Sequence, residues 1–452
     1  MTPVQAPISI EFSNRDLKRL IIPLIIEQLL AYTVGLADSL MVAQVGEAAV
    51  SAVSLVDSVS VLLLNAFSSL AAGGAIVAGQ YLGRRETEKA SRSAQQLLLL
   101  MGELSLVVTA GLYLLRPFVL DVVFGSIAPD VHAHANTYYL IVQASNFFLA
   151  VYSAGAALLR VMGNAAASMK VSMVMNLINV AGNALLIFGF HMGVAGVAIP
   201  TLISRVAAAV LILVALRRPG LPLRLELPFS FRHERTMIRN NLYVGVPNGI
   251  EGSMFQLGKI LLLSVVSPFG TASVAANAVG NAVCAFQILA PQSIGLGMVT
   301  VVSRCVGAGD FEKARAYTRK LIRWGYGALA LTVVAIELLL PVILWAYNLS
   351  AEATRYALMI ITAHGLIGVA LWVPSFQLPQ TLRAAGDTRY TMTVSSLSMW
   401  AFRVVLGVWL ARGLGFGLLG VWGAMFVDWA FRALLFLLRY RSHRWEFSAL
   451  QD

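Results

Sequence analysis

Long uninterrupted apolar segments constrain the fold of this chain more than any other feature of its sequence. Residues 59–78 and 325–344 are two of them, and each is close to the roughly 20 residues with which a helix crosses the hydrocarbon core of a bilayer. Only 12% of the residues are charged, whereas soluble domains average about 25%. Backbone groups in lipid need partners within the structure, and the alternating pattern of barrel strands is absent. The sequence therefore predicts an all-α polytopic membrane protein.

Apolar segments separated by short polar connections predict about twelve transmembrane helices, six in each half of the chain. In the first half these are residues 18–43, 48–80, 94–116, 132–160, 168–190 and 194–217. In the second half they are residues 241–267, 272–304, 318–346, 354–382, 388–411 and 417–440. The first apolar segment is long and has no small-residue cleavage site, so we expect it to remain as the first span.

The distribution of basic residues predicts how these spans are oriented. Lysine and arginine gather in every second connection and near both termini, as expected of cytoplasmic segments. We therefore expect a multi-pass protein of the cell (inner or plasma) membrane with both termini in the cytoplasm. The net charge of +11 belongs to this pattern, so nucleic acid is not an expected partner. Cys284 and Cys305 form no zinc motif, and no phosphate-binding loop or catalytic pattern is present, so we expect neither a cofactor nor an enzyme.

The second half of the chain repeats the first at a constant offset of 224 residues. Pro23 and Glu27 correspond to Pro247 and Glu251, and a shift of one residue aligns segment 160–164 with segment 383–387. Because each half has an even number of predicted helices, both halves enter the membrane from the same side, as parallel repeats do. The predicted domains are an N-terminal lobe at residues 1–217, a cytoplasmic linker at 218–240 and a C-terminal lobe at 241–452. A cleft between two such lobes suits alternating access.

Four polar residues of the N-terminal lobe form a candidate cation-coupling site. Ionisable residues within membrane spans are costly, and they mark functional sites by default. Depth along the predicted helices places the four in the outer half of the lobe, and they are Asp38, Asn179, Asn183 and Thr201. A carboxylate, amide oxygens and a hydroxyl suit Na⁺, or a proton shared with the acid. Interhelical hydrogen bonding is the alternative, and depth alone favours neither.

A candidate substrate cavity is predicted from polar residues near the middle of the spans, where transporters of this design bind substrate. It comprises Asp57, Glu251, Gln256, Lys259, Asn277, Gln287 and Gln377. Pro374 and Pro379 predict a broken helix beside Gln377. Structural roles are predicted for four other ionisable residues, Glu27, Arg403, Asp428 and Arg432, the last two being one helical turn apart and able to pair. His364 has no matching ligands and is predicted to be a hydrogen-bonded core residue.

Several motifs, in order and partly duplicated, resemble those of the multidrug and toxic compound extrusion (MATE) family, with the DinF-like bacterial branch as the nearest. They are Pro23, Glu27-Gln28 and Asp38 in the first helix, Gly46-x-Ala-x-Val-x-Ala52, Gln80-Tyr-Leu-Gly83, and Leu-Arg-Ala-Ala-Gly386-Asp387-Thr. The resemblance covers nearly the whole chain. It implies efflux driven by Na⁺ or H⁺ through a V-shaped pair of lobes that opens to either side.

The resemblance also implies a cation site with an Asp in helix 1, an Asn and an Asp in helix 5 and a Thr in helix 6. Asp38, Asn179 and Thr201 match this set, whereas Asn183 stands where the second acid is expected. The departure removes one carboxylate and shifts the expectation from Na⁺ towards H⁺. Other members use acids of the C-terminal lobe, where Glu251 could serve, although helix 10 lacks the expected carboxylate.

The leading functional hypothesis is secondary active multidrug efflux by a monomer, with small amphiphilic or cationic organic compounds exchanged for H⁺ or Na⁺. The alternative is a lipid-linked oligosaccharide flippase of the same superfamily. Such flippases usually have two further spans and a basic cavity, whereas twelve spans and mixed polar residues are found here. A receptor or scaffold is disfavoured, because neither needs a duplicated six-helix unit with buried acids.

Overall fold

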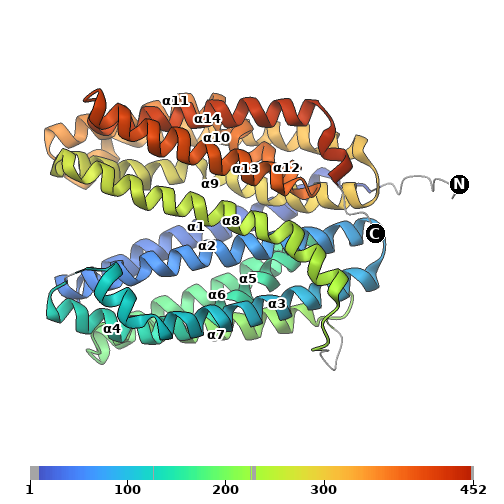
Figure 1. The fold of residues 1–452 in the computed structure, drawn as a ribbon, viewed down its shortest axis with the longest axis horizontal. Helices are drawn as coiled ribbons and strands as arrows, with labels where there is room; N and C mark the ends of the chain where they lie inside the picture. The colour runs from blue at the N-terminus through green and yellow to red at the C-terminus, as the bar shows by residue number, and fades with distance from the viewer. Residues whose placement is uncertain (1–9, 126, 224, 226–230, 449–452) are drawn as a thin grey trace, which may run out of the picture. The chain divides into compact units, whose positions relative to one another are not determined.

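The computed structural model describes residues 10–125, 127–223, 225 and 231–448. Within this part of the chain, the regular structure is helical and contains no strand. Eleven helices are long and apolar enough to cross a membrane, and a bent pair of shorter helices raises the number to twelve. The predicted all-α fold of about twelve spans is therefore confirmed (Figure 1).

The first half of the chain forms seven α-helices and two short π-helical segments. They are α1 (Asn14–Ala43), α2 (Glu47–Gly83), α3 (Thr87–Leu114), η1 (Phe118–Val123), α4 (Pro129–Ala144), α5 (Asn146–Val161), α6 (Ala165–Ala184), η2 (Leu185–Gly189) and α7 (Ala195–Leu216).

The second half forms the remaining helices, again with short π-helical or 3₁₀ segments between them. They are α8 (Arg235–Val266), η3 (Ser267–Phe269), α9 (Thr271–Gly307), α10 (Phe311–Tyr347), α11 (Ala351–Trp372), η4 (Val373–Gln377), α12 (Leu378–Ala384), α13 (Thr388–Ser398), η5 (Met399–Leu406), η6 (Trp409–Gly413), α14 (Gly417–Arg441) and η7 (Arg444–Ser448).

Contacts divide the chain into two compact units, which we call the N-terminal unit (Asn14–Gly249) and the C-terminal unit (Ile250–Asp452 with Met1–Ser13). The division lies inside α8, whose first residues pack on helices of the first half. A Cβ atom on Gly73 of α2 would lie 2.5 Å from the Cα of Gly245. Ser93 of α3 donates to the amide oxygen of Asn241 at 3.0 Å. Small residues and polar contacts are the usual means by which helices associate in lipid.

Two predicted boundaries are shifted in the structure. Helix α8 begins at Arg235, so the last residues of the predicted linker 218–240 are helical, while residues 224 and 226–230 lie outside the described part. The predicted single helix 132–160 is instead the pair α4 and α5, bent by 44°. At the bend, Ser145 donates to the Val142 carbonyl at 2.5 Å and accepts a hydrogen bond from Arg205 at 2.7 Å. Side-chain bonds that compete with the backbone ladder are a recognised cause of helix kinks.

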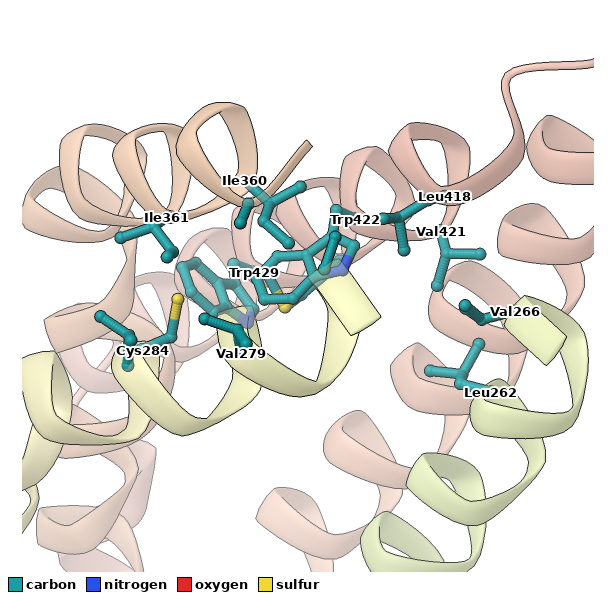
Figure 2. Close-up of a cluster of buried hydrophobic side chains, with 14 of the residues drawn as sticks. Leu262, Val266, Val279, Cys284, Ile360, Ile361, Leu418, Val421, Trp422 and Trp429 are labelled. Atoms are coloured by element: carbon teal, nitrogen blue, oxygen red, sulfur yellow. The ribbon is translucent and has the colours of Figure 1, made fainter. Parts of the chain in front are cut away.

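Closely packed side chains fill the core of each unit. In the C-terminal unit, Trp422 and Trp429 of α14 face Ile360 and Ile361 of α11 (Figure 2). Gly280 of α9 leaves room for the Ile360 side chain, because a Cβ atom at position 280 would lie 2.5 Å from Ile360 Cδ1. In lipid, dispersion contacts of this kind hold helices together, since lipid tails are as apolar as the side chains.

The predicted broken helix around Pro374 remains helical. The segment η4 has π-helical turns between α11 and α12. The Ser375 hydroxyl lies 2.6 Å from the carbonyl oxygens of both Leu371, in α11, and Trp429, in α14, and can donate a hydrogen bond to either. The helix is therefore widened locally at Pro374 instead of being broken there.

Candidate cation and substrate site

The structure brings Asp38, Asn179, Asn183 and Thr201 together in the N-terminal unit. Asn183 Nδ2 donates to Asp38 Oδ1 at 2.9 Å. In the amide orientation that satisfies both of its neighbours, Asn179 points its nitrogen at the two Asp38 oxygens, 2.9 and 3.0 Å away, and its oxygen at Thr201 Oγ1, 3.2 Å away. Helices α1, α6 and α7 therefore meet at one half-buried carboxylate.

The donors around Asp38 suit its charged form, because a carboxylate only accepts hydrogen bonds. Asp38 has no arginine or lysine partner within the described residues. Oδ1 of Asn183 is buried and has no hydrogen-bond partner in that part of the chain. A protonated Asp38 could donate to such an oxygen after a rotation of the Asn183 amide. A metal ion would need both amides to turn their oxygens inward, and no cluster of three His, Cys, Asp or Glu side chains occurs among the described residues.

A second acid of the N-terminal unit, Asp57 of α2, lies close enough to Asp38 for their charges to interact. Tyr138 of α4 donates to Asp57 Oδ1 at 3.0 Å. Arg205 of α7 acts electrostatically on the same carboxylate. Arg205 was not among the residues predicted from the sequence, although it follows Thr201 by one helical turn and so shares its helix face.

Two other acids are neutralised by arginines at positions related by the sequence repeat. Glu27 accepts a hydrogen bond from Arg160 at 2.5 Å. Glu251 forms a two-bond pair with Arg383. Both acids are buried, with exposures of 5% and 8%. Because a charged partner compensates each of them, neither is free to take up a cation without breaking its pair.

The pairing expected from the spacing of Asp428 and Arg432 is present in α14, with Arg432 Nε 2.8 Å from Asp428 Oδ1. Ser398 donates to the same carboxylate oxygen. The guanidinium of Arg432 also donates to the Ser395 carbonyl at 3.0 Å. This ion pair is fully enclosed by the C-terminal unit.

The residues of the predicted substrate cavity are divided between the two units. Asp57 belongs to the N-terminal unit and the other six belong to the C-terminal unit. Three amides are buried and bonded: Asn277 to Trp422 at 3.1 Å, Gln287 to His364 at 2.6 Å and Gln377 to the Leu321 carbonyl at 2.9 Å. Gln256 is half-buried, and Lys259 is exposed.

One further acid escaped the sequence analysis. Glu337 of α10 accepts a hydrogen bond from Thr362 at 2.9 Å, and its other oxygen is buried without a partner among the described residues. It lies within a predicted span, so its charge alone could have identified it.

Comparison with known proteins agrees with this architecture. The MatE family model matches residues 23–185 and 247–409, one copy in each half. The chain is 27% identical to "Uncharacterized transporter YisQ" of Bacillus subtilis, covering 94% of this chain and 93% of that protein. It is 25% identical to "Probable multidrug resistance protein NorM" of Thermotoga maritima, covering 96% and 93%.

The fold is similar to that of a solved structure, with a TM-score of 0.88 and 19% identity over 95% of both chains. That structure is described as an outward-facing conformation of a multidrug resistance MATE family transporter of the MOP superfamily. At this identity the match shows the fold alone. The family match, by contrast, covers most of the sequence and repeats in both halves. The chain therefore belongs to the MatE family of multidrug efflux transporters.

Proposed function

We propose that the protein exports small amphiphilic organic compounds across the cell membrane in exchange for protons, with Asp38 as the coupling carboxylate. The observation that carries this proposal is the setting of Asp38, a carboxylate inside a membrane span held by two asparagine amides. It has no ion-pair partner within the described residues, whereas Glu27, Glu251 and Asp428 each have an arginine. An acid without such a partner can bind and release a cation at the lowest cost to the fold.

Protons are favoured over Na⁺ because the site offers one negative charge and donors that face it. Asn183 supplies an amide where a second carboxylate would attract a metal ion. Proton binding needs only one acceptor for the new O–H group, and the unpartnered Asn183 Oδ1 is a candidate. Na⁺ is the rival ion, and it would need several oxygens to turn inward.

Asp57, Tyr138 and Arg205 link the coupling acid to a second carboxylate in the same unit. We infer that protonation of Asp38 changes the field at Asp57, since the two charges interact. Acids of this kind attract cationic groups of amphiphilic compounds, which connects proton binding to release of substrate. The transporter acts as a monomer with both termini in the cytoplasm and alternates its access between the two sides of the membrane. The comparisons do not favour the lipid-linked oligosaccharide flippase.

The test is efflux of a fluorescent organic cation from proteoliposomes in which a pH gradient and a Na⁺ gradient are imposed separately. We expect the pH gradient alone to drive transport, and Asp38→Asn to abolish that transport while the variant still folds. Asp130→Asn is the matched control, because Asp130 is an exposed acid in the first turn of α4. Transport driven by Na⁺ alone would assign the other ion, and wild-type rates in Asp38→Asn would remove this residue from the mechanism.

A further inference from the structure

Two basic side chains in membrane spans of the C-terminal unit have no hydrogen-bond or ion-pair partner among the described residues. They are Arg403 of η5 and Lys259 of α8. The Nε atom of Arg403 is buried and unpartnered. Arg403 is ten residues from the nearer end of its span, which ends at Gly413, so it lies about 15 Å inside that end. Guanidinium groups at such depth almost always pair with an acid or with backbone carbonyls.

The two side chains come from neighbouring helices in matching register. Gly258 of α8 is packed against Met399 of η5, and a Cβ atom on Gly407 would lie 3.8 Å from Leu262 Cδ2. Lys259 is the residue after Gly258, and Arg403 lies one helical turn after Met399 and one turn before Gly407. Their positive charges are close enough to repel each other. The fold therefore brings two like charges together within the predicted membrane spans.

Aromatic rings lie beside this pair. Phe255 precedes Lys259 by one helical turn, and its ring centroid is 5.4 Å from the Arg403 guanidinium. Phe376 meets Phe255 edge to face at 6.2 Å, and Trp372 stacks on Phe376 at 5.4 Å. Stacking on aromatic faces is a preferred setting for arginine. The rings add a flat apolar surface next to the positive charge.

The acid that acts on Arg403 already forms an ion pair with another arginine. Asp428 acts on Arg403 electrostatically, but its Oδ1 is bound by Arg432 and Ser398. Its Oδ2 is buried and has no hydrogen-bond partner among the described residues, Arg403 included. Arg432 itself lies over Phe255 and Phe376, at 5.6 and 5.3 Å from their centroids. Two arginines therefore share one carboxylate, and Lys259 has no acid partner among the described residues. The cluster has an excess of positive charge that the described residues do not balance.

We propose that Arg403 and Lys259 form a binding site for the carboxylate group of an aromatic organic compound. The guanidinium would bind the carboxylate through two parallel hydrogen bonds, and Lys259 would add a second positive charge. Phe255 and Phe376 would contact the aromatic body. This inference extends the proposed function, since it adds carboxylates and zwitterions to the cationic substrates. It rests on the proposed function only because it treats the bound compound as one that is transported.

Binding to the purified full-length protein tests the site without any gradient. The probes are 2-naphthoate, its neutral amide and (2-naphthyl)methylammonium, titrated by calorimetry into protein in nanodiscs of phosphatidylcholine. We expect 2-naphthoate to bind about tenfold more tightly than the neutral amide, because one charge-assisted hydrogen bond contributes a binding free energy of that size. Arg403→Gln should remove this preference, Lys259→Gln should reduce it and Arg403→Lys should keep part of it. Arg412→Gln, an exposed arginine near the end of the same span, is the matched control.

Equal binding of the three probes to wild-type protein would overturn the proposal, as would a carboxylate preference that survives Arg403→Gln. If Arg403→Gln does not fold, Lys259→Gln and Arg403→Lys carry the same test. A lipid headgroup is the other source of an anion, so the titration is repeated in phosphatidylglycerol nanodiscs. Competition by that lipid, with no binding of 2-naphthoate in phosphatidylcholine, would assign the site to lipid and reject the proposal. Because these measurements involve no transport, a failure of proton-coupled efflux would leave their result unaffected.

Discussion

Asn183 of α6 donates a hydrogen bond to Asp38 of α1, with Nδ2 and Oδ1 2.9 Å apart and Asn183 completely buried. The bond joins two helices that are far apart in sequence, at a carboxylate that has no ion-pair partner among the described residues. It also places a neutral donor where a second acid would create a doubly negative site. The identity of residue 183 therefore decides how much negative charge a bound cation would meet.

We predict that Asn183→Asp makes the N-terminal unit responsive to Na⁺. Two adjacent carboxylates cannot both ionise cheaply unless a cation lies between them. A ligand that binds only the folded state raises stability by about 2.7 kcal/mol at 100 times its dissociation constant. Thermal unfolding of the purified variant should therefore shift upward in NaCl relative to KCl, whereas the wild type should not respond.

The control for this experiment is Asn348→Asp, since Asn348 is an exposed residue just after α10. That variant should unfold at the same temperature in both salts. A Na⁺-dependent shift already present in the wild-type protein would show that the native site binds Na⁺, against the proton-coupling proposal.

Tyr138→Phe should weaken transport more than it weakens the fold. The change removes the hydroxyl that donates to Asp57 at 3.0 Å and costs about 1 kcal/mol of stability. The neighbouring Tyr139→Phe is a matched control, because its hydroxyl donates only to the Leu112 carbonyl at 2.9 Å. Unfolding temperatures of the two variants should fall by similar amounts, while proton-driven efflux should fall in Tyr138→Phe alone. Equal transport by both variants would separate Asp57 from the coupling pathway.

The sequence predicted the helices and their repetition because both depend on local composition. Apolar length identifies a span, and a constant offset identifies a duplication. Helix periodicity and depth also selected Asp38, Asn179 and Thr201, which the structure brings together. The hydrogen bond at the bend could not be predicted in this way, because Ser145 accepts it from Arg205, which is 60 residues further along the chain.

The ion pairs could not be predicted from helix periodicity either. Arg160 lies 133 residues from Glu27, a separation at which periodicity carries no information. A signal was nevertheless present, since both members of this pair recur in the second half as Glu251 and Arg383. Duplicated opposite charges in an apolar sequence therefore predict a contact better than either charge alone. Arg403 and Lys259 have no such duplicated acids, which agrees with the absence of a partner for them among the described residues.

Gly73→Val is predicted to destabilise the packing of α2 on the start of α8. A Cβ atom at position 73 would lie 2.5 Å from Gly245 Cα and 2.8 Å from the Val244 carbonyl oxygen. These are backbone atoms, so a helix would have to move, and overpacking of this kind costs about 1–3 kcal/mol. Gly111→Val is the control, because nothing lies within 4 Å of a Cβ atom there. The unfolding temperature should be lower in Gly73→Val than in the wild type and nearly unchanged in Gly111→Val. A larger loss in Gly111→Val than in Gly73→Val would contradict the packing of α2 on α8.

The Glu27–Arg160 pair gives the sharpest test of a structural role for buried charge in this protein. Removing one partner leaves the other uncompensated, which costs about 3–5 kcal/mol in a buried site, and less here because the Arg160 side chain is 24% exposed. Glu27→Leu and Arg160→Met should each destabilise the protein, whereas the double variant should recover much of the loss. Unfolding measurements on all four proteins yield the coupling energy directly. Additive losses would show that the two charges do not stabilise each other, and loss of proton-driven efflux in a stable double variant would mean that Glu27 has a transport role beyond its ion pair.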